Sequence, residues 1–355
     1  MRIWSVAPLA AAAFATVGAS GGAFADASQR ISGPHIHQNL AVYFVHGASA
    51  PGAVPLTLQE AMARGKVQVI ETGNVNTLQI ENSGTEEVFI QAGDIVKGGK
   101  QDRVLTVSFI LAPKSGRVPI DSFCVEQGRW SARAGEQVDR FNSSYAAMPS
   151  RKALMAMAAP PPAAPPTTGA VNAQARDSGD VANKQRKVWD EVAKTQGDLS
   201  ARLGASVASP RSASSLQLTM ENEKLNEART AYIKAIEAEG MKEGDVIGYI
   251  VAINGKMSAA SLYPSNGLFR KMWSKQLAAV VTEAIGERTA TGTQPPTPPQ
   301  APAAKEFLSA AEKGKSHERA SAATMRQETR DSDAALYNEA RRADGKWVHR
   351  SYLAK

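Results

Sequence analysis

Short apolar runs separated by turn sequences dominate the chain between residues 36 and 130, a pattern typical of β-strands. Residues 39–45 form one such run, and further strands are expected at 67–72, 77–81, 87–91, 103–111 and 118–126. One short helix interrupts them at Thr57–Arg64, where Thr57 can cap the helix, Glu60 follows three residues later and Gly65 ends it. Because the strands follow each other without long helices between them, the pattern predicts an antiparallel sandwich or open barrel.

After residue 182 the apolar spacing changes to that of helices. Val188, Val192, Leu199 and Leu203 share one helix face, and a second helix is expected from Leu218 to Ile236, ending at Gly240. A buried strand at 246–253 then turns at Asn254-Gly255 into 256–263, and a third helix spans 269–284. A final hairpin pairs 335–341 with 346–353. The predicted class is therefore α+β, with a β-rich N-terminal part followed by helices and β-hairpins.

Residues 1–25 have the pattern of a secretory signal peptide. Arg2 precedes an alanine-rich apolar run, and Ala23-Phe24-Ala25 is a typical cleavage site. The run is shorter than the roughly 20 residues that a membrane-spanning helix needs. We therefore expect cleavage after Ala25, no transmembrane anchor afterwards, and a periplasmic or secreted protein.

Two segments rich in Pro and Ala divide the remaining chain. They span 148–181 and 289–304, and such composition is typical of linkers or loops. The predicted organisation is a β-rich part at 26–147, an α+β part of the same domain at 182–288, and a charged segment at 305–355 that ends in the hairpin.

Composition excludes several classes of protein. A formal net charge of +7 over 355 residues is mild, and no dense basic stripe of the kind that nucleic-acid readers carry is visible. The single cysteine, Cys124, excludes an intramolecular disulfide and any multi-cysteine metal site. His35, His37 and His46 lie on neighbouring strands but lack a fixed acidic partner, so we expect no metal site. The sequence leaves the identity of any cofactor unknown.

The first candidate for chemistry is the loop from Gly93 to Arg103. The Gly98-Gly99 pair permits positive φ angles, which present consecutive N–H groups to an anion. Lys97, Lys100 and Arg103 bring cations to the same loop. A tight turn with exposed lysines explains the same residues.

The second candidate is the run Cys124–Trp130. Cys124 and Glu126 share a strand face, and Arg129 or Trp130 can fold over it. A thiolate nucleophile needs a base or a lowered pKa, and no histidine partner is identifiable. A buried, inert cysteine is the simpler interpretation.

These two motifs resemble those of the ARG-and-Rhodanese-Phosphatase-superfamily-associated protein domain, a family without an established activity. Three further segments are similar to the same family: Val67–Gly73, the helix around Lys187–Val192 and the hairpin at 249–263. The resemblance covers roughly residues 31–288. Through the family's association with ADP-ribosylglycohydrolase-type proteins, it implies chemistry on ADP-ribose or a related phosphorylated ligand.

The resemblance also implies that the two motifs join in one site. The expected ligand-binding residues are Lys97, Gly98, Gly99, Lys100, Gln101, Asp102, Arg103, Gln127 and Trp130. The expected catalytic residues are Glu126 as general base, Arg129 as the stabiliser of developing charge, and Cys124.

Two interpretations of function remain open at this point, and a thiol-redox role for Cys124 is a weaker third. In the first, the domain binds, and with Glu126 hydrolyses, an anionic phosphorylated small molecule. In the second, it is a non-catalytic module that binds an envelope protein or a cell-wall polymer, and the two motifs are structural turns held by an Asp102–Arg129 or Glu126–Arg103 pair.

Overall fold

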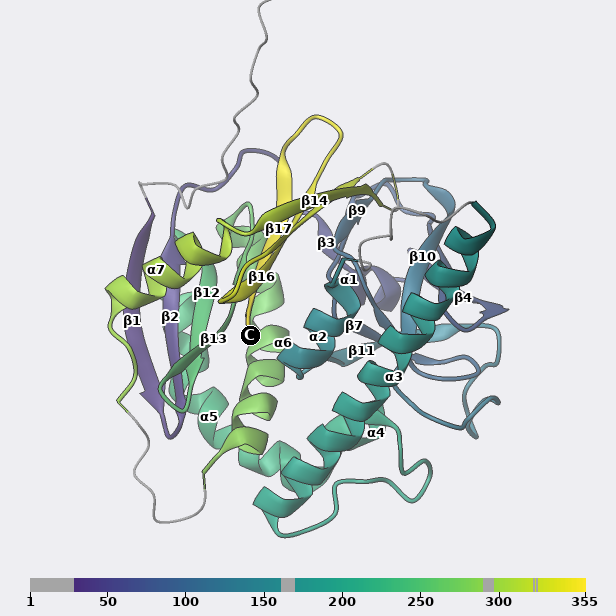
Figure 1. The fold of residues 1–355 in the computed structure, drawn as a ribbon, viewed down its shortest axis with the longest axis horizontal. Helices are drawn as coiled ribbons and strands as arrows, with labels where there is room; N and C mark the ends of the chain where they lie inside the picture. The colour runs from purple at the N-terminus through teal and green to yellow at the C-terminus, as the bar shows by residue number, and fades with distance from the viewer. Residues whose placement is uncertain (1–28, 161–169, 290–296, 322, 324) are drawn as a thin grey trace, which may run out of the picture.

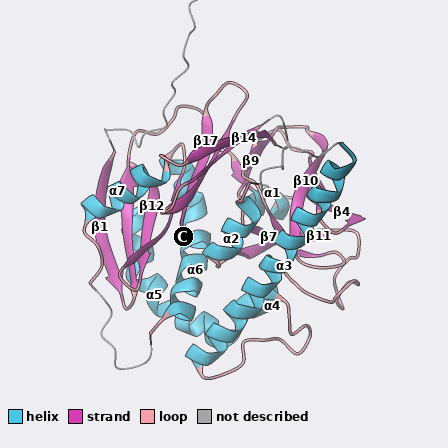
Figure 2. Ribbon diagram, viewed as in Figure 1, coloured by secondary structure: helices cyan, strands magenta, loops and turns pink. Residues whose placement is uncertain are grey.

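Two large antiparallel sheets and the helices between them make up the fold in the computed structural model (Figures 1 and 2). The structure describes residues 29–160, 170–289, 297–321, 323 and 325–355. The predicted α+β class is confirmed. The expected signal peptide at 1–25 lies outside the described residues.

The larger sheet combines strands from both ends and the middle of the chain. Its order is β1-β2-β12-β13-β17-β16-β15-β14, and every neighbouring pair is antiparallel. The strands span Arg30–His37 (β1), Leu40–His46 (β2), Val246–Ile253 (β12), Lys256–Leu262 (β13), Lys315–Ala320 (β14), Arg326–Asp331 (β15), Ala335–Arg341 (β16) and Trp347–Ala354 (β17). The Asn254-Gly255 turn and the final hairpin form as predicted, and β17 joins that hairpin to the centre of the sheet by pairing with β13.

Helices cover both faces of this sheet. Helices α5 (Glu223–Met241) and α6 (Asn266–Glu287) pack on one face, where Phe44, Phe269 and Trp273 are buried together. Helix α7 (Ala301–Ala311) packs on the other face through Phe307 and Leu308. A strand buried on both faces is apolar throughout, which explains the continuous runs in β2 and β12.

The smaller sheet curls into the predicted open barrel. Its order is β11-β7-β8-β10-β5-β4, and its edge strands meet at an isolated bridge between Ile70 and Arg140. The strands span Val67–Asn74 (β4), Thr77–Asn82 (β5), Asp94–Gly98 (β7), Arg103–Leu105 (β8), Gly116–Cys124 (β10) and Phe141–Ala147 (β11).

Three short strands and one short helix complete the β-rich part. Strands β3 (Leu56–Thr57), β6 (Val88–Ile90) and β9 (Phe109–Leu111) form a separate sheet. The strand expected at 103–111 is therefore two strands, β8 and β9, in different sheets. Helix α1 (Leu58–Ala63) begins with the predicted capping box of Thr57 and Glu60.

The Pro/Ala-rich segments contain more structure than the sequence indicated. Residues expected to be linker form helix α2 (Arg151–Ala158) and the start of α3 (Ala170–Leu203). Ser150 caps α2, and Ala153 and Met157 are buried, which stabilises a helix in this composition. In the second segment, α7 begins at Ala301, and the Tyr43 hydroxyl donates a hydrogen bond to the Pro299 carbonyl.

The helix expected from Leu218 to Ile236 is also two helices. Helix α4 (Leu216–Met220) ends where the Asn222 side chain caps the start of α5. A side-chain cap gives the first N–H groups of a helix their acceptor, so it marks a real break. Among the described residues, no helix combines the length and the apolar character that crossing a bilayer requires.

Candidate functional site

The Gly-Gly loop is the tip of a hairpin rather than a long loop. Residues 94–98 form β7, and β8 begins at Arg103, so only residues 99–102 make the turn. Gly98 and Gly99 have φ angles of 118° and 55°. A β-carbon on Gly99 would lie 2.8 Å from Cε1 of Phe141, and closer still to Cζ. The glycine pair is therefore required by the turn and by its contact with β11.

The two sequence motifs meet in one buried set of charges, the arginine–carboxylate cluster, formed by Asp102, Glu126, Arg129 and Arg133. Arg133 binds Asp102 through both terminal nitrogens, at 2.6 and 2.9 Å, and lies 3.3 Å from Glu126. Arg129 Nε donates to Glu126 at 2.7 Å. Burial by itself lowers the pKa of Arg133, but the hydrogen bonds to Asp102 raise it above its usual value. The cluster is thus a mutually neutralising network.

The backbone amides of the glycine pair already have partners within the chain. The N–H of Gly98 donates to Asp102 Oδ1 at 3.0 Å, and that of Gly99 donates to the Arg140 carbonyl at 3.1 Å. The expected cradle for an external anion is therefore filled by the protein's own acceptors in this conformation.

Glu126 is likewise engaged. Its side chain is fully buried, and Arg129 and Arg133 both donate to its oxygens. The expected Asp102–Arg129 pair is present at 3.7 Å, whereas Arg103 pairs with Glu71 at 3.5 Å instead of with Glu126. In this geometry Glu126 and Arg129 bind each other, and their roles as base and charge stabiliser stay predictions.

Arg103, Lys100 and Trp130 lie together at the edge of the cluster. Lys100 Nζ is 5.0 Å and Arg103 Cζ is 5.6 Å from the centre of the Trp130 ring, which is 45% exposed. Arg103 itself is fully buried. Gln101 Nε2 donates to the Glu126 carbonyl, and the Gln127 N–H donates to Ser214. Lys100 and Trp130, two of the expected ligand-binding residues, thus meet at the protein surface.

Cys124 ends strand β10 and is fully buried. Burial raises the pKa of its thiol to about 11, because a thiolate would be poorly solvated there. The thiol is therefore protonated at neutral pH, which argues against a nucleophilic or redox role.

Lys97, at the other side of the hairpin, opens onto a groove that the sequence analysis missed. The groove lies between β7, β11, α4 and α5, and its volume is about 1180 Å³ with its open side included. Lys97 lies in it with Arg229 and Tyr145, whose side chain is 81% exposed. Lys97 Nζ contacts Glu221 at 2.6 Å, and Glu221 has further partners in Gln217 and Arg211.

Arg229 is the unusual residue of this groove. It is 8% exposed and forms no ion pair with any carboxylate among the described residues. Its hydrogen bonds go to neutral acceptors: the Met220 carbonyl at 2.7 Å, Thr282 at 3.4 Å and Asn226. Burial without a compensating carboxylate lowers its pKa to about 10. The sequence carried one signal of this, because Arg229 occupies the apolar stripe of α5 defined by Leu225, Tyr232 and Ile236.

Of the histidines near the N-terminus, His35 and His46 lie beside acidic residues, and His37 lies beside an aromatic ring. His46, Glu243 and Asp245 lie close enough to hold a cation, and His46 Nδ1 is 2.8 Å from Asp245. The Arg30 guanidinium lies among them, 2.7 Å from Glu243 and 2.9 Å from His46. Arg30 thus supplies the positive charge there. His35 pairs with Glu239 at 3.4 Å, and His37 packs against the Tyr232 ring.

The comparison with protein families gives one match, to the ARG and Rhodanese-Phosphatase-superfamily-associated Protein domain, over residues 28–353. No curated protein and no solved structure matches the chain. The match spans both large sheets, all the described helices and the final hairpin. The chain therefore belongs to the ARG and Rhodanese-Phosphatase-superfamily-associated protein domain family.

Proposed function

We propose that the protein binds a small anionic ligand of the phosphorylated, nucleotide-like class in the groove beside Lys97. The observation that carries this proposal is Arg229, a buried guanidinium without a carboxylate partner in the described part of the chain. Buried charges in proteins are normally paired, since an isolated one has a large desolvation penalty. A phosphate in the groove would supply the missing negative charge.

The rest of the groove fits such a ligand. Lys97 adds a second cation, and its partner Glu221 retains Gln217 and Arg211 when Lys97 turns towards a ligand. Tyr145 presents an exposed ring beside these cations, which favours a ligand that also carries a planar base. ADP-ribose and related nucleoside diphosphates combine both features. The proposal concerns binding, because no general base has been located next to Arg229.

The test measures ligand binding with Arg229→Met, which removes the charge and keeps much of the volume. Calorimetric titration of residues 26–355 with ADP-ribose, ADP and inorganic phosphate should give binding that the variant weakens at least tenfold. The variant itself should be as stable as the wild type or more stable, because it loses an uncompensated buried charge. The matched control is Lys224→Met, which removes an exposed cation from the same helix.

Equal affinity in Arg229→Met and the wild type, or no binding of any of these anions, would contradict the proposal. Lys100→Ala tests whether the ligand extends to the hairpin tip. Weaker binding in that variant would include the Gly98-Gly99 turn in the site, and unchanged binding would restrict the site to the groove.

A second candidate function is a non-catalytic module that binds an envelope protein or a cell-wall polymer. The observation that favours it is Trp130, which is 45% exposed and flanked by Lys100 and Arg103, as aromatic anchors of interfaces often are. A stoichiometric partner that is recovered from envelope extract with the wild type and lost with Trp130→Ala would support this function. Recovery that is independent of Trp130 would contradict it.

The second candidate assumes export, which we propose from the first 25 residues. Protein recovered from the periplasm or medium should begin at Asp26. Protein that begins at Met1 and remains in the cytoplasm would contradict export, and with it the envelope partner.

A further inference from the structure

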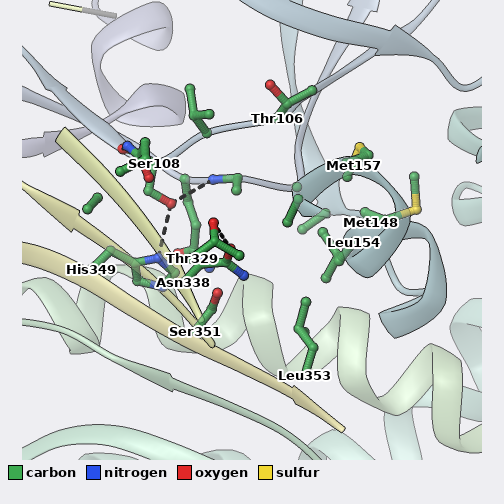
Figure 3. Close-up of a pocket in the computed structure, with 18 of the residues that line it drawn as sticks. Thr106, Ser108, Met148, Leu154, Met157, Thr329, Asn338, His349, Ser351 and Leu353 are labelled. Carbon is green, nitrogen blue, oxygen red and sulfur yellow. Dashed lines mark hydrogen bonds between the residues drawn. The ribbon is translucent and has the colours of Figure 1, made fainter. Parts of the chain in front are cut away.

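A second, more enclosed pocket lies at the C-terminal end of β11, next to the groove in the chain. It is bounded by strands β15–β17, by residues 106–108 and by helix α2, and its volume is about 730 Å³ with its mouth included (Figure 3). Of the two sequence motifs, only Gly93, the first residue of the Gly93–Arg103 loop, lines it. Ala147 and Met148 line it directly after residues 143–146, which line the groove.

One wall of this pocket is polar and held by hydrogen bonds. Ser108 Oγ lies 3.0 Å from His349 Nδ1 and accepts the Ala92 N–H, also at 3.0 Å. Gln327 Nε2 donates a hydrogen bond to the Ser108 carbonyl at 2.7 Å. Thr329 donates to Asn338 Oδ1 at 3.0 Å. These contacts fix the positions of side chains that would meet a ligand.

Two groups in this wall have unused hydrogen-bonding capacity. His349 is 4% exposed, and its Nε2 has no hydrogen-bond partner within the described ranges. In either tautomer, Nε2 is left with one bond unmade. The Asn338 side-chain NH₂ likewise donates to no described residue. Because His349 Nε2 is buried without a partner, which costs stability, a polar atom from outside the chain would stabilise this wall. Asn338 is half-buried, so its NH₂ adds a second donor beside Nε2 without that cost.

The facing wall is apolar. Met148 and the α2 residues Leu154 and Met157 lie opposite the polar strands, with Leu353 below them (Figure 3). The lining residues that the structure describes include no Asp, Glu or Lys, and their single arginine, Arg319, is exposed on the edge strand β14. Burial lowers the pKa of His349 to about 3, so its imidazole is neutral at physiological pH. The pocket thus favours an uncharged occupant.

We propose that this pocket is a separate binding site for a small uncharged molecule, whose hydrogen-bonding head meets His349 Nε2 and the Asn338 amide and whose apolar body packs against α2. The ligand class differs from that of the groove, which holds two cations. The two sites are therefore separable by experiment.

The test uses three probes of one size in ligand-observed NMR with residues 26–355: benzamide, benzoate and benzylamine. Benzamide should bind, and the two charged probes should bind at least tenfold more weakly. Leu154→Trp fills the apolar wall and should abolish benzamide binding. Lys152→Trp, which adds the same ring at an exposed position of α2, should leave it unchanged.

Asn338→Asp is an independent test of the site, because it adds one negative charge without changing the shape of the side chain. It should weaken benzamide binding at least tenfold and make benzylamine the preferred probe. Arg229→Met should leave benzamide binding unchanged, which separates this site from the groove. The proposal is overturned if no probe binds, if benzoate binds as well as benzamide, or if neither Leu154→Trp nor Asn338→Asp alters binding.

Discussion

At the scale of single residues, Gly99 shows how a motif that suggests ligand binding is explained by packing. Its φ of 55° is one constraint, and the closeness of Phe141 Cε1, 2.8 Å from the place a β-carbon would take, is another. Each of them disfavours a side chain. Gly116 has a similar φ of 61°, but nothing lies within 4 Å of its missing β-carbon. The two glycines therefore allow the constraints to be measured separately.

We expect Gly116→Ala to lower the free energy of unfolding by about 1 kcal/mol, the cost of the left-handed conformation for a residue with a side chain. Gly99→Ala should lower it by an additional 1–3 kcal/mol or so, because Phe141 must also move. Chemical denaturation of both variants checks this. An equal decrease in the free energy of unfolding of the two variants would show that Phe141 moves aside without destabilising the fold.

Glu283 provides a prediction about pH. Burial raises the pKa of its carboxyl to about 7 in the folded protein, whereas the unfolded chain has a value near 4.5. The folded state thus holds the proton more tightly, so this group's contribution to stability is complete below pH 4.5 and is lost as the pH rises through 7.

Glu283→Gln should therefore be more stable than the wild type at pH 8, by about 1–3 kcal/mol, and equally stable near pH 4.5. The amide oxygen keeps the acceptor for the Arg151 N–H, which Glu283 binds at 3.0 Å. Thermal unfolding between pH 4.5 and 8.5 measures the difference. Glu227→Gln, at an exposed position of α5, is the control, and a constant difference across this range would refute the assignment.

At the scale of elements, Arg133 joins three segments that are far apart in the chain. It binds Asp102 in the β7–β8 turn and Glu126 after β10, and it contacts Ser215, which caps α4. These contacts hold the turn, the loop at 125–140 and α4 in one arrangement.

Arg133→Met should lower the free energy of unfolding by about 3–5 kcal/mol, because Asp102 would then remain buried without its two short bonds to Arg133 and Glu126 would lose one of its two arginines. Arg117→Met, which removes an exposed arginine 3.7 Å from Glu81, should change it by less than about 1 kcal/mol. Adding Asp102→Asn should recover part of the loss in Arg133→Met. If Arg133→Met changes the free energy of unfolding by less than the expected amount, water enters the cluster and solvates the two carboxylates.

The elements themselves were largely predictable, and their partners were not. The capping box at Thr57, the Asn254-Gly255 hairpin and the helix 266–287 depend on neighbouring residues, so local patterns indicate them. Helix α2 was missed because an Ala-rich, Pro-flanked segment becomes helical only when Ala153 and Met157 are buried, and α2 packs against α3 and the distant strand β17. Likewise, the motifs indicated Asp102 and Glu126, but Arg133 and Arg229 become significant only through contacts across the fold.

At the scale of the whole molecule, the eight-stranded sheet makes the N-terminal and C-terminal halves depend on each other. Strand β2 pairs with β12, so Phe44 lies opposite Tyr249, and β13 pairs with β17. The boundaries expected near 147 and 182 therefore leave the two smaller sheets whole but divide the strands of the eight-stranded sheet between the two parts.

In a fragment of residues 26–147, strands β1 and β2 should stay unfolded, because β2 would lose β12 and the cover of α5 and α6. We expect the amide NMR resonances of residues 30–46 to be poorly dispersed in the fragment, and mixing with residues 148–355 to restore their native positions. Native-like resonances of β1 and β2 in the isolated fragment would contradict this interpretation of the sheet.

The pairing of β2 with β12 also affects how fast the molecule can fold. More than half the length of the chain separates Phe44 from Tyr249, and all the strands of the small barrel lie between them. Loop-closure entropy grows slowly with length, but contacts between distant segments slow folding strongly. The barrel can assemble early from strands that are close in the chain, whereas the large sheet forms later because its paired strands are far apart. Refolding from denaturant should accordingly show a fast phase for the barrel and a slower one for the sheet, and a chain interrupted at the second stage would expose the apolar strands β2 and β12.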